Sequence, residues 1–280
     1  MKILKYLTYS LALMAMLASC DKHEILYDTT PADGGAEFQL HYFEPISNTA
    51  ANYIDSVYVN GKKITCVNGG GNLLPYNAVP SGATGRFFST PAGNNKIELY
   101  RKGEIVYTAD VNLAKGKQNI IVHDLNAEPI ILDNQYPYPH VSGQAQAATW
   151  NTDSLATVKF VNVVYEETGK PYEGKLQYQW QNPKTKEWEN LGDPVGFGEA
   201  TDRCPVLVIK STFNSSGYCR IDYRILDEDG NVWQHYNSGG KFTNYSDYWN
   251  AYIGRSYMHF LSGIRKDKNL RVAVKQWTSL

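Results

Sequence analysis

Long hydrophobic runs are scarce in this chain of 280 residues. A membrane-spanning helix needs about 20 consecutive apolar residues, and the apolar stretch from Leu7 to Leu17 is too short and is interrupted by Thr8 and Ser10. No segment has a convincing amphipathic helical period, whereas tyrosine is abundant, with 21 residues. Because aromatic and β-branched residues favour strands, the composition predicts an all-β protein without a spanning helix.

Charge of one sign and catalytic signatures are lacking as well. The 27 basic and 28 acidic side chains nearly balance, which does not indicate a nucleic-acid ligand or electrostatic attraction to anionic lipid. The 6 histidines form no H-x-x-x-H or H-E-x-x-H pair, and G-x-S-x-G, P-loop and Rossmann motifs are missing. We therefore predict no catalytic residue, cofactor or metal site, and keep an enzyme with an unrecognised cleft as an alternative.

One acidic cluster, Asp227 to Asn231, has two interpretations. Its closely spaced carboxylates could offer oxygen ligands to Ca²⁺, but the distal Glu of a complete calcium loop is missing. The Asp229-Gly230 pair instead favours a hairpin turn, because glycine readily adopts the positive φ angle that such turns need. We expect the turn.

The first twenty residues have the layout of a secretory signal. Lys2 and Lys5 precede the apolar stretch, which ends in Leu17-Ala18-Ser19-Cys20. This ending matches the bacterial lipoprotein pattern, so we predict that Cys20 receives diacylglycerol and an amide-linked acyl chain such as palmitate. Each buried CH₂ stabilises the anchored state by about 0.8 kcal/mol. The chain is therefore predicted to be an exported outer-membrane lipoprotein, exposed at the cell surface, with the membrane as its partner through Cys20.

Cysteine is also rare. With Cys20 committed to lipid, Cys66, Cys204 and Cys219 remain, so one disulfide at most can form. Cys204 with Cys219 is the better candidate pair, because both lie in one predicted module in an oxidising compartment. A hairpin about Ser215-Ser216 would oppose this pairing, since it places Thr212 rather than Cys204 opposite Cys219.

Turn residues and composition divide the chain into five parts. We predict a signal peptide and lipobox at 1–20, a tether at 21–35, a first β-sandwich at 36–128, a linker at 129–154 and a second β-sandwich at 155–280. Hairpin turns are expected at Asn60-Gly61 and Lys102-Gly103. A short repeat, Gly116–Val122 against Gly254–Phe260, favours two related modules. The predicted fold is therefore a tandem of immunoglobulin-like β-sandwiches.

Aromatic residues are unevenly distributed, since all 6 tryptophans lie in the linker or the second half. Trp180 on an alternating strand and Trp233 are expected in the core. Residues 244–252 combine aromatics with short polar side chains and are predicted to be a loop. The ligand-binding candidates in this loop are Tyr245, Tyr248, Trp249 and Tyr252. Aromatic rings stack on sugar faces and also serve protein contacts, although rings that close the end of a sandwich are the alternative.

Three segments of the first module carry a family resemblance. They are Val57-Tyr58-Val59-Asn60-Gly61-Lys62, Thr90-Pro91-Ala92-Gly93 and Leu113-Ala114-Lys115-Gly116-Lys117. This pattern, over about 90 residues, resembles the exported β-sandwich proteins of the family called domain of unknown function 4397. The second module departs from it because it has no Pro-Ala-Gly element. As a whole the chain resembles two-domain surface lipoproteins of gut-type Gram-negative anaerobes, and the resemblance supplies no catalytic residues.

Such bacteria also O-glycosylate exported proteins at short Asp-Ser/Thr motifs. This implies candidate sites at Thr29 in the tether and Ser154 in the linker. The leading prediction is a non-catalytic, membrane-anchored surface lipoprotein for cell adhesion, assembly, or carbohydrate or protein binding. A fimbrillin-like or accessory pilus structural subunit is the alternative.

Overall fold

The computed structural model describes residues 35–46, 49–64, 87–136, 155–209 and 218–279. These residues form strands joined by turns, and their one helical element is a single 3₁₀ turn, η1 (Ala50–Asn52). None of their helices is long and apolar enough to cross a membrane. The prediction of an all-β fold built from β-sandwiches is confirmed.

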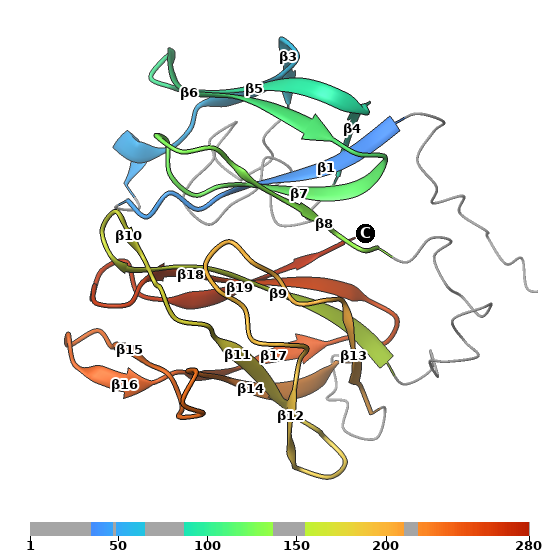
Figure 1. Ribbon diagram of the computed structural model, residues 1–280, viewed down its shortest axis with the longest axis vertical. Coiled ribbons are helices and arrows are strands. Elements are labelled where there is room, and N and C mark those ends of the chain that lie inside the picture. The colour runs from blue at the N-terminus through green and yellow to red at the C-terminus, as the bar shows by residue number, and fades with distance from the viewer. Residues whose placement is uncertain (1–34, 47–48, 65–86, 137–154, 210–217, 280) are drawn as a thin grey trace, which may run out of the picture.

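The first half of the chain forms two packed sheets (Figure 1). Its strands are β1 (Gly35–Tyr42), β2 (Ser56–Val59), β3 (Lys62–Ile64), β4 (Phe88–Pro91), β5 (Gly93–Arg101), β6 (Glu104–Leu113), β7 (Gly116–Val122) and β8 (Ile130–Asp133). One sheet has the order β3-β2-β5-β6 and the other β4-β1-β7-β8. Alternate residues such as Phe38, Leu40, Ile97 and Leu99 point between the sheets and form an apolar core.

The second half forms a larger sandwich. Its strands are β9 (Leu155–Glu167), β10 (Lys170–Pro171), β11 (Gln177–Gln181), β12 (Trp188–Asn190), β13 (Cys204–Leu207), β14 (Cys219–Leu226), β15 (Gln234–Tyr236), β16 (Phe242–Asn244), β17 (Ser246–Ala251), β18 (Ser256–Ile264) and β19 (Ala273–Thr278). The sheet β12-β11-β14-β17 packs on the sheet β10-β9-β18-β19, in which β13 also pairs with β9. As predicted, Trp180 and Trp233 lie in the core between these sheets, together with Leu176 and Tyr178.

The two sandwiches share one strand order. β1 pairs with β7 in parallel and with β4 antiparallel, and β9 pairs with β18 in parallel and with β13 antiparallel. The equivalent strands are β1 and β9, β2 and β11, β3 and β12, β4 and β13, β5 and β14, β6 and β17, β7 and β18, and β8 and β19. The predicted repeat locates the equivalent strands β7 and β18, each of which follows or begins at a glycine with positive φ, Gly116 and Gly254. Its register is wrong by one residue, since Ile120 lies in the first core while its predicted partner Met258 lies between the sandwiches. Among the described strands, β10, β15 and β16 have no counterpart in the first sandwich.

Both predicted hairpins are present in the first sandwich. Asn60 and Gly61 join β2 to β3 with φ angles of 52° and 73°, and Lys102 and Gly103 join β5 to β6 with 54° and 79°. Two successive positive φ angles define the type I′ turn, whose twist matches that of the paired strands. The turn signals in the sequence therefore located both strand reversals.

The predicted linker begins too early. Ile130–Asp133 forms β8, which pairs antiparallel with β7, and the residues from 137 to 154 lie outside the described part of the chain. The prolines of this segment exclude a central strand, but Pro129 precedes β8 and β8 lies at the edge of its sheet. Residues 130–133 can therefore extend the sheet as its edge strand.

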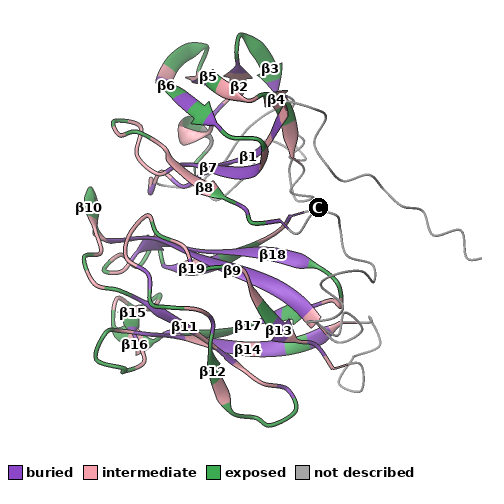
Figure 2. Cartoon of the chain, turned by 45° about the vertical axis from the view of Figure 1, so that its right-hand side comes forward, coloured by how far each residue is buried: buried purple, intermediate pink, exposed green. Residues whose placement is uncertain are grey.

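The two sandwiches are stacked through a third apolar cluster. The sheets that contain β1 and β9 face each other, and the buried side chains between them are Phe43, Ile121, Val161, Val163, Met258 and Phe260. All nine residues of β18 are buried, because one face of the strand packs inside its own sandwich and the other packs on the first sandwich. Figure 2 shows this continuous buried middle of the molecule. The chain consequently forms four sheet layers.

Polar groups also join the sandwiches. The Arg203 guanidinium donates to the carbonyl of Asn134 at 2.6 Å and to its Oδ1 at 2.8 Å. Asn134 Nδ2 donates to Asn119 Oδ1 at 2.7 Å and to Ser279 Oγ at 3.1 Å. The Lys117 Nζ donates to the Ser279 carbonyl at 3.1 Å. Burial lowers the pKa of Arg203 to about 10. The guanidinium therefore stays charged at neutral pH and joins the second sandwich to Asn134 of the first.

Candidate functional site

The predicted aromatic loop is in fact a strand, and this part of the sequence interpretation is wrong. Ser246–Ala251 is β17, which pairs antiparallel with β14. Successive side chains of a strand point to opposite faces, so the aromatics of this segment are separated rather than gathered. Trp249 is 2% exposed and Tyr245 is 4% exposed, whereas Tyr248 on the opposite face is 45% exposed.

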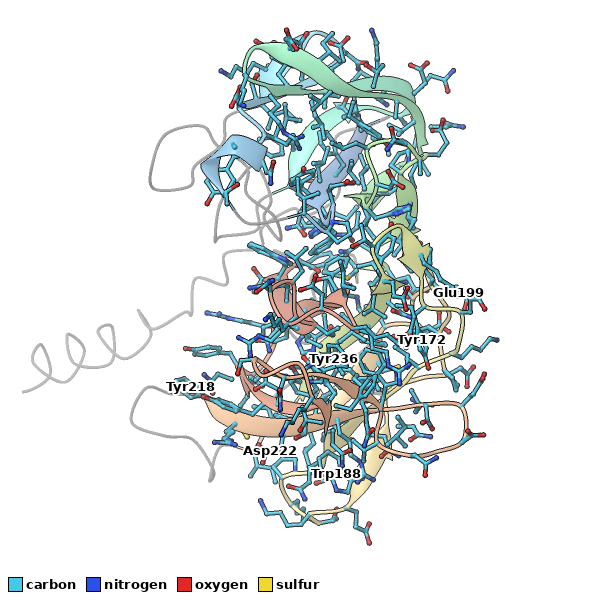
Figure 3. The ribbon with its side chains drawn as sticks, turned by 90° about the vertical axis from the view of Figure 1, so that its left-hand side faces the viewer. Tyr172, Trp188, Glu199, Tyr218, Asp222 and Tyr236 are labelled. Atoms are coloured by element: carbon cyan, nitrogen blue, oxygen red, sulfur yellow. The ribbon has the colours of Figure 1, made fainter. Side chains whose placement is uncertain are left out.

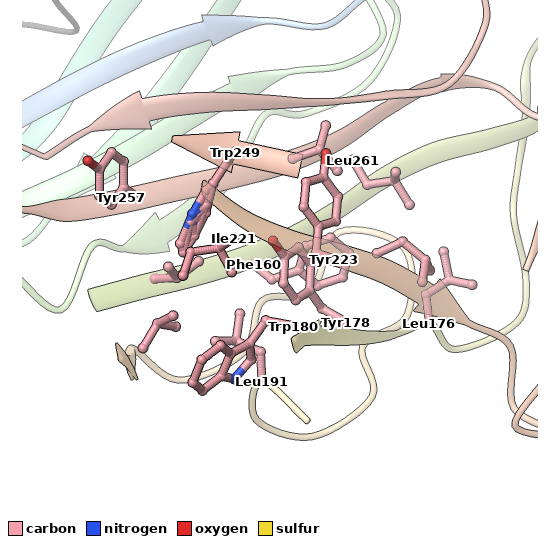
Figure 4. Close-up of a cluster of buried hydrophobic side chains, with 14 of the residues drawn as sticks. Phe160, Leu176, Tyr178, Trp180, Leu191, Ile221, Tyr223, Trp249, Tyr257 and Leu261 are labelled. Atoms are coloured by element: carbon pink, nitrogen blue, oxygen red, sulfur yellow. The ribbon is translucent and has the colours of Figure 1, made fainter. Parts of the chain in front are cut away.

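Trp249 lies in the core of the second sandwich (Figure 4), and Tyr245 belongs to the same core. The indole of Trp249 meets the imidazole ring of His259 edge-on, with ring centroids 4.7 Å apart. The Tyr245 hydroxyl accepts a hydrogen bond from the Val274 amide at 2.8 Å. Burial raises the pKa of Tyr245 to about 12. Neither residue is available to a ligand, and only the alternative of rings that fill the sandwich fits them.

Tyr252 follows β17 and belongs to a different region from Tyr248. Its ring lies 4.1 Å from the Arg255 guanidinium and 5.9 Å from the Tyr218 ring. The structure therefore does not bring the four predicted binding residues together. Of the four, Tyr248 is the one that lies on an exposed sheet face with other ligand-binding chemistry.

That face is the outer side of the sheet β12-β11-β14-β17, turned away from β9 and β18. We call it the outer face and define it by Gln179, Trp188, Arg220, Asp222, Arg224 and Tyr248. In β14 the outward Arg220, Asp222 and Arg224 alternate with the buried Ile221 and Tyr223. Figure 3 places the labelled Trp188 and Asp222 at the end of the molecule farthest from the first sandwich.

Two arginines of the outer face lie over aromatic rings. The Arg224 guanidinium is 4.4 Å from the Trp188 ring centroid, and its Nε donates to Gln179 Oε1 at 2.9 Å. The Arg220 guanidinium is 3.9 Å from the Tyr248 ring centroid and contacts Asp222 Oδ1 at 2.8 Å. Contacts between a cation and a ring hold the planar guanidinium in one orientation. The face thus offers two ordered pairs of ring and hydrogen-bond donors.

A sheet face of this kind can bind sugars. Sugar rings present CH groups that pack on aromatic faces, while their hydroxyls bond to guanidinium, amide and carboxylate groups. Gln179 orients this group, since its Oε1 accepts from Arg224 Nε at 2.9 Å and its Nε2 donates to Asn190 Oδ1 at 2.7 Å. Trp188, Arg220 and Arg224 were not predicted from the sequence. The charged residues that alternate with Ile221 and Tyr223 in β14 are the pattern that marks this outward side.

The cysteine prediction is wrong. Cys204 and Cys219 form no disulfide with each other, because β13 and β14 belong to opposite sheets of the second sandwich. Cys204 lies beside Val158 of β9, and Cys219 lies beside Ala251 of β17. Burial raises the pKa of the Cys204 thiol. Cys204 is therefore held as a neutral thiol.

The acidic cluster forms the expected turn. The Asp227 amide bonds the Asn231 carbonyl at 2.9 Å, and Asp227 Oδ1 accepts from the Asn231 amide at 2.9 Å. Gly230 has a φ of 80°, as the turn requires. Within the described ranges, no three His, Cys, Asp or Glu side chains are grouped so that they could hold a metal ion.

Two histidines occupy core positions. His41 Nε2 lies 2.9 Å from Asn119 Nδ2, and His259 Nδ1 lies 3.1 Å from the Tyr178 hydroxyl. Burial lowers the pKa of each imidazole to about 3, so both are neutral at physiological pH. The carboxyl of Glu44 also has a raised pKa because it is buried, and its Oε2 accepts a hydrogen bond from the Leu125 amide at 2.8 Å. These groups have structural partners.

Three predicted modification sites, Cys20, Thr29 and Ser154, lie outside the described residues. The same holds for the tether and for Cys66. Their chemistry rests on the sequence patterns alone.

Comparisons with known proteins show only distant likenesses. No protein-family model and no curated protein matches the chain, so the resemblance to domain of unknown function 4397 stays a prediction. The TIE protein of Bacillus anthracis matches 81% of this chain at 9% identity and a TM-score of 0.23, and the chain spans only 34% of that protein.

Two solved structures match over nearly their whole lengths. A candidate cell adhesion protein of Bacteroides eggerthii is 7% identical with a TM-score of 0.22, covering 90% of this chain and 97% of its own. A candidate polysaccharide-binding protein of Bacteroides thetaiotaomicron is 10% identical with a TM-score of 0.19, covering 87% and 96%. At such low TM-scores no property of these proteins is transferred to the present chain.

Proposed function

We propose that this protein is a surface lipoprotein, held in the outer membrane through Cys20, that binds glycans on the outer face of its second sandwich. The observation that carries the proposal is the pair of arginine–aromatic contacts, Arg224 on Trp188 and Arg220 on Tyr248. They combine planar apolar surface with oriented hydrogen-bond donors on one exposed sheet.

Stability alone is a weak reason for this arrangement. Exposed ion pairs contribute about 0–1 kcal/mol to folding, and Arg220 and Asp222 form such a pair, with side chains 60% and 43% exposed. Contacts between cations and rings at exposed sites contribute about 0.5–1 kcal/mol. The polar and aromatic side chains of the face are therefore better explained by a ligand than by the fold.

The position of the face suits an anchored receptor. The described chain begins with β1 in the first sandwich, and the outer face belongs to the sheet farthest from it in the four-layer stack (Figure 1). A tether that precedes β1 would hold the first sandwich toward the membrane. The outer face is then directed away from the bilayer, where extracellular polysaccharides are encountered.

A glycan array followed by calorimetry on the hits tests the proposed function. The double variant Trp188→Ala/Tyr248→Ala should weaken binding at least about tenfold, since each lost ring contact is worth about 1 kcal/mol. The matched control is Tyr58→Ala/Tyr100→Ala, which removes the ring pair on the equivalent face of the first sandwich, with centroids 5.1 Å apart. Absence of binding to every glycan, or equal loss in both double variants, would overturn the proposal.

The anchor has its own test. In the native host, the chain with Cys20→Ser should leave the membrane fraction, and protease shaving of intact cells should remove the wild-type protein. Retention of the variant in the membrane would contradict the lipid anchor without affecting the glycan site.

A structural subunit of a fimbrillin-like assembly is the second candidate. The observation in its favour is that β1, the strand nearest the predicted anchor, lies in the middle of its sheet between β4 and β7. Loss of this strand would open a long groove lined by core residues. Filaments of the purified mature chain on electron micrographs would favour this candidate, and a monomer that binds glycans would exclude it.

A further inference from the structure

We infer that the glycan is acidic, and that Arg224 is the residue that binds its carboxylate. The inference rests on the proposed function of the outer face and adds the chemical class of the ligand. It follows from how the two arginines of the face differ in their contacts.

Arg224 has an oriented guanidinium whose far edge is uncommitted. Its Nε donates to Gln179 Oε1 at 2.9 Å, and its Cζ lies 4.4 Å from the Trp188 ring centroid. Within the described part of the chain, its two terminal nitrogens have no hydrogen-bond or ion-pair partner. Trp188 and Gln179 therefore fix the guanidinium while leaving its two-nitrogen edge open.

Arg220 differs because its charge is already balanced. Its Nε donates to Asp222 Oδ1 at 2.9 Å, and its Nη2 lies 2.8 Å from the same oxygen. The neighbouring acidic residue of β12, Glu189, accepts a hydrogen bond from Asn182 instead and points to the other side of the sheet, opposite Trp180. Among the side chains that define the outer face, one positive charge is left over, and it belongs to Arg224.

A carboxylate fits this group better than a hydroxyl does. The planar guanidinium presents parallel N–H donors that match the two oxygens of a carboxylate, and such charged, bidentate bonds are roughly twice as strong as neutral ones. A uronic acid carries a carboxylate together with a CH face that can pack on Trp188. Arg220 and Arg224 are four residues apart in β14, which spans about 13 Å, so Tyr248 would contact a neighbouring sugar of the same chain.

The experiment compares two forms of one polymer. Oligomers of polygalacturonate and their fully methyl-esterified form have the same backbone, but esterification removes the carboxylate charge. With the full mature chain in about 0.15 M salt, the acid should bind at least about tenfold tighter than the ester, as expected for one charged hydrogen-bonded contact. Dextran sulfate and dextran, run in parallel, distinguish carboxylate from sulfate recognition.

Variants at Arg224 locate the effect. Arg224→Gln should abolish the preference for the acid while keeping the weaker binding of the ester, and Arg224→Lys should restore only part of it because lysine lacks the two-nitrogen edge. Arg255→Gln is the matched control, since it removes an arginine stacked on Tyr252 outside the outer face. Melting temperatures of all three variants establish that they are folded.

The possible failures are separable. Equal binding of acid and ester, an unchanged preference in Arg224→Gln, or a preference for dextran sulfate alone would overturn the inference. Binding of neutral glycans but not of polygalacturonate would overturn it and leave the proposed function intact. Absence of binding to every glycan would overturn both.

Discussion

The two sandwiches share one strand order and differ in what their outer sheets display. On the first, Tyr58 and Tyr100 pair with each other, and Lys96 forms an ion pair with Glu98 at 2.7 Å, so rings and charges are separate. On the second, each arginine lies on an aromatic ring, Arg220 on Tyr248 and Arg224 on Trp188. A common topology therefore carries two different surfaces, and only the second combines charge with aromatic surface in one unit.

The sandwiches also differ at their ends. β10 and the hairpin β15–β16 are found only in the second, where they surround Arg265. This guanidinium contacts Glu166 at 3.1 Å and lies 5.4 Å from the Tyr172 ring, 5.5 Å from the Trp233 ring and 5.2 Å from the Phe242 ring. The additional elements thus close one end of the larger sandwich beside a half-buried group of charges, in which Glu166 also lies 2.8 Å from Lys266.

Trp249→Ala should have the largest effect, because it breaks the core of the second sandwich. Truncation of a buried tryptophan costs about 3–5 kcal/mol, and Trp249 is 2% exposed. Its exposed neighbour is the control, since Tyr248→Ala removes only the contact with Arg220 and should cost no more than about 1 kcal/mol. Urea unfolding of both variants measures the difference. Similar midpoints for the two would show that the inward and outward assignment of β17 is wrong.

Arg203→Met should come next and separate the sandwiches. Hydrogen bonds to a charged group contribute about 1.5–3 kcal/mol, and the variant removes those that join Arg203 to Asn134. Calorimetry should show one thermal transition in the wild type and two in the variant. Arg255→Met, whose guanidinium stacks on Tyr252, should retain a single transition. If Arg203→Met also unfolds in one step at the wild-type temperature, the network does not couple the sandwiches.

Acid should destabilise both halves through one histidine in each. Burial lowers the pKa of His41 and of His259 from 6.5 to about 3. Between these pH values the unfolded chain binds protons that the folded chain excludes. The free energy of unfolding therefore has its full value above about pH 6.5 and decreases as the pH falls toward 3. Each histidine adds a slope of about 1.4 kcal/mol per pH unit.

Single replacements test this pH dependence. His41→Gln and His259→Gln should each lower the slope by about 1.4 kcal/mol per pH unit when urea midpoints are measured from pH 7.5 to 4.5. The part that remains in each variant includes the contributions of His123 and His235, whose pKa values are also lowered by burial. A variant whose slope equals that of the wild type would show that its histidine is already protonated in the folded protein.

Turn glycines should give the smallest effect and the same one in both sandwiches. Gly61 has a φ of 73° and Gly230 a φ of 80°, and an added Cβ would meet no atom within 4 Å at either position. Replacement of either glycine by alanine should therefore lower the free energy of unfolding only by the cost of placing an L-residue in the left-handed conformation, about 1–2 kcal/mol. Thermal unfolding of Gly61→Ala and Gly230→Ala should give equal losses. A much larger loss at one of them would reveal a contact that the turn geometry does not require.

Local features were predictable because short-range chemistry decides them. The residue types of Asn60-Gly61 and Lys102-Gly103 favour hairpin turns through their own backbone preferences. The alternation of Tyr178 and Trp180 with glutamines indicates a strand with one face in a core. The repeat around Gly116 and Gly254 located two equivalent strands, although its register is shifted by one residue. These features depend on residues that are close in the sequence and not on which strands are neighbours in the sheets.

Non-local features were missed for the opposite reason. Cys204 and Cys219 are close in sequence, but their strands join different sheets, which no local signal indicates. The aromatic residues of β17 are close together in the sequence, but successive side chains of a strand point to opposite faces of the sheet and so separate them. His41 and His259 carry no motif, and only the packing of neighbouring sheets makes them buried. Arg203 and Asn134, 69 positions apart, meet only because the sandwiches stack.

By itself, the sequence determined that the chain would form alternating strands with known reversal points, since side-chain period and turn chemistry act over a few residues. It also contains the anchor pattern that ends at Cys20. Only the tertiary structure decided which face of each sheet is covered. β18 is covered on both faces, whereas the sheet of β14 is covered on one. The burial of a strand depends on the elements that pack against it and not on its own sequence alone. The same packing leaves Trp188, Arg224 and Tyr248 on the surface.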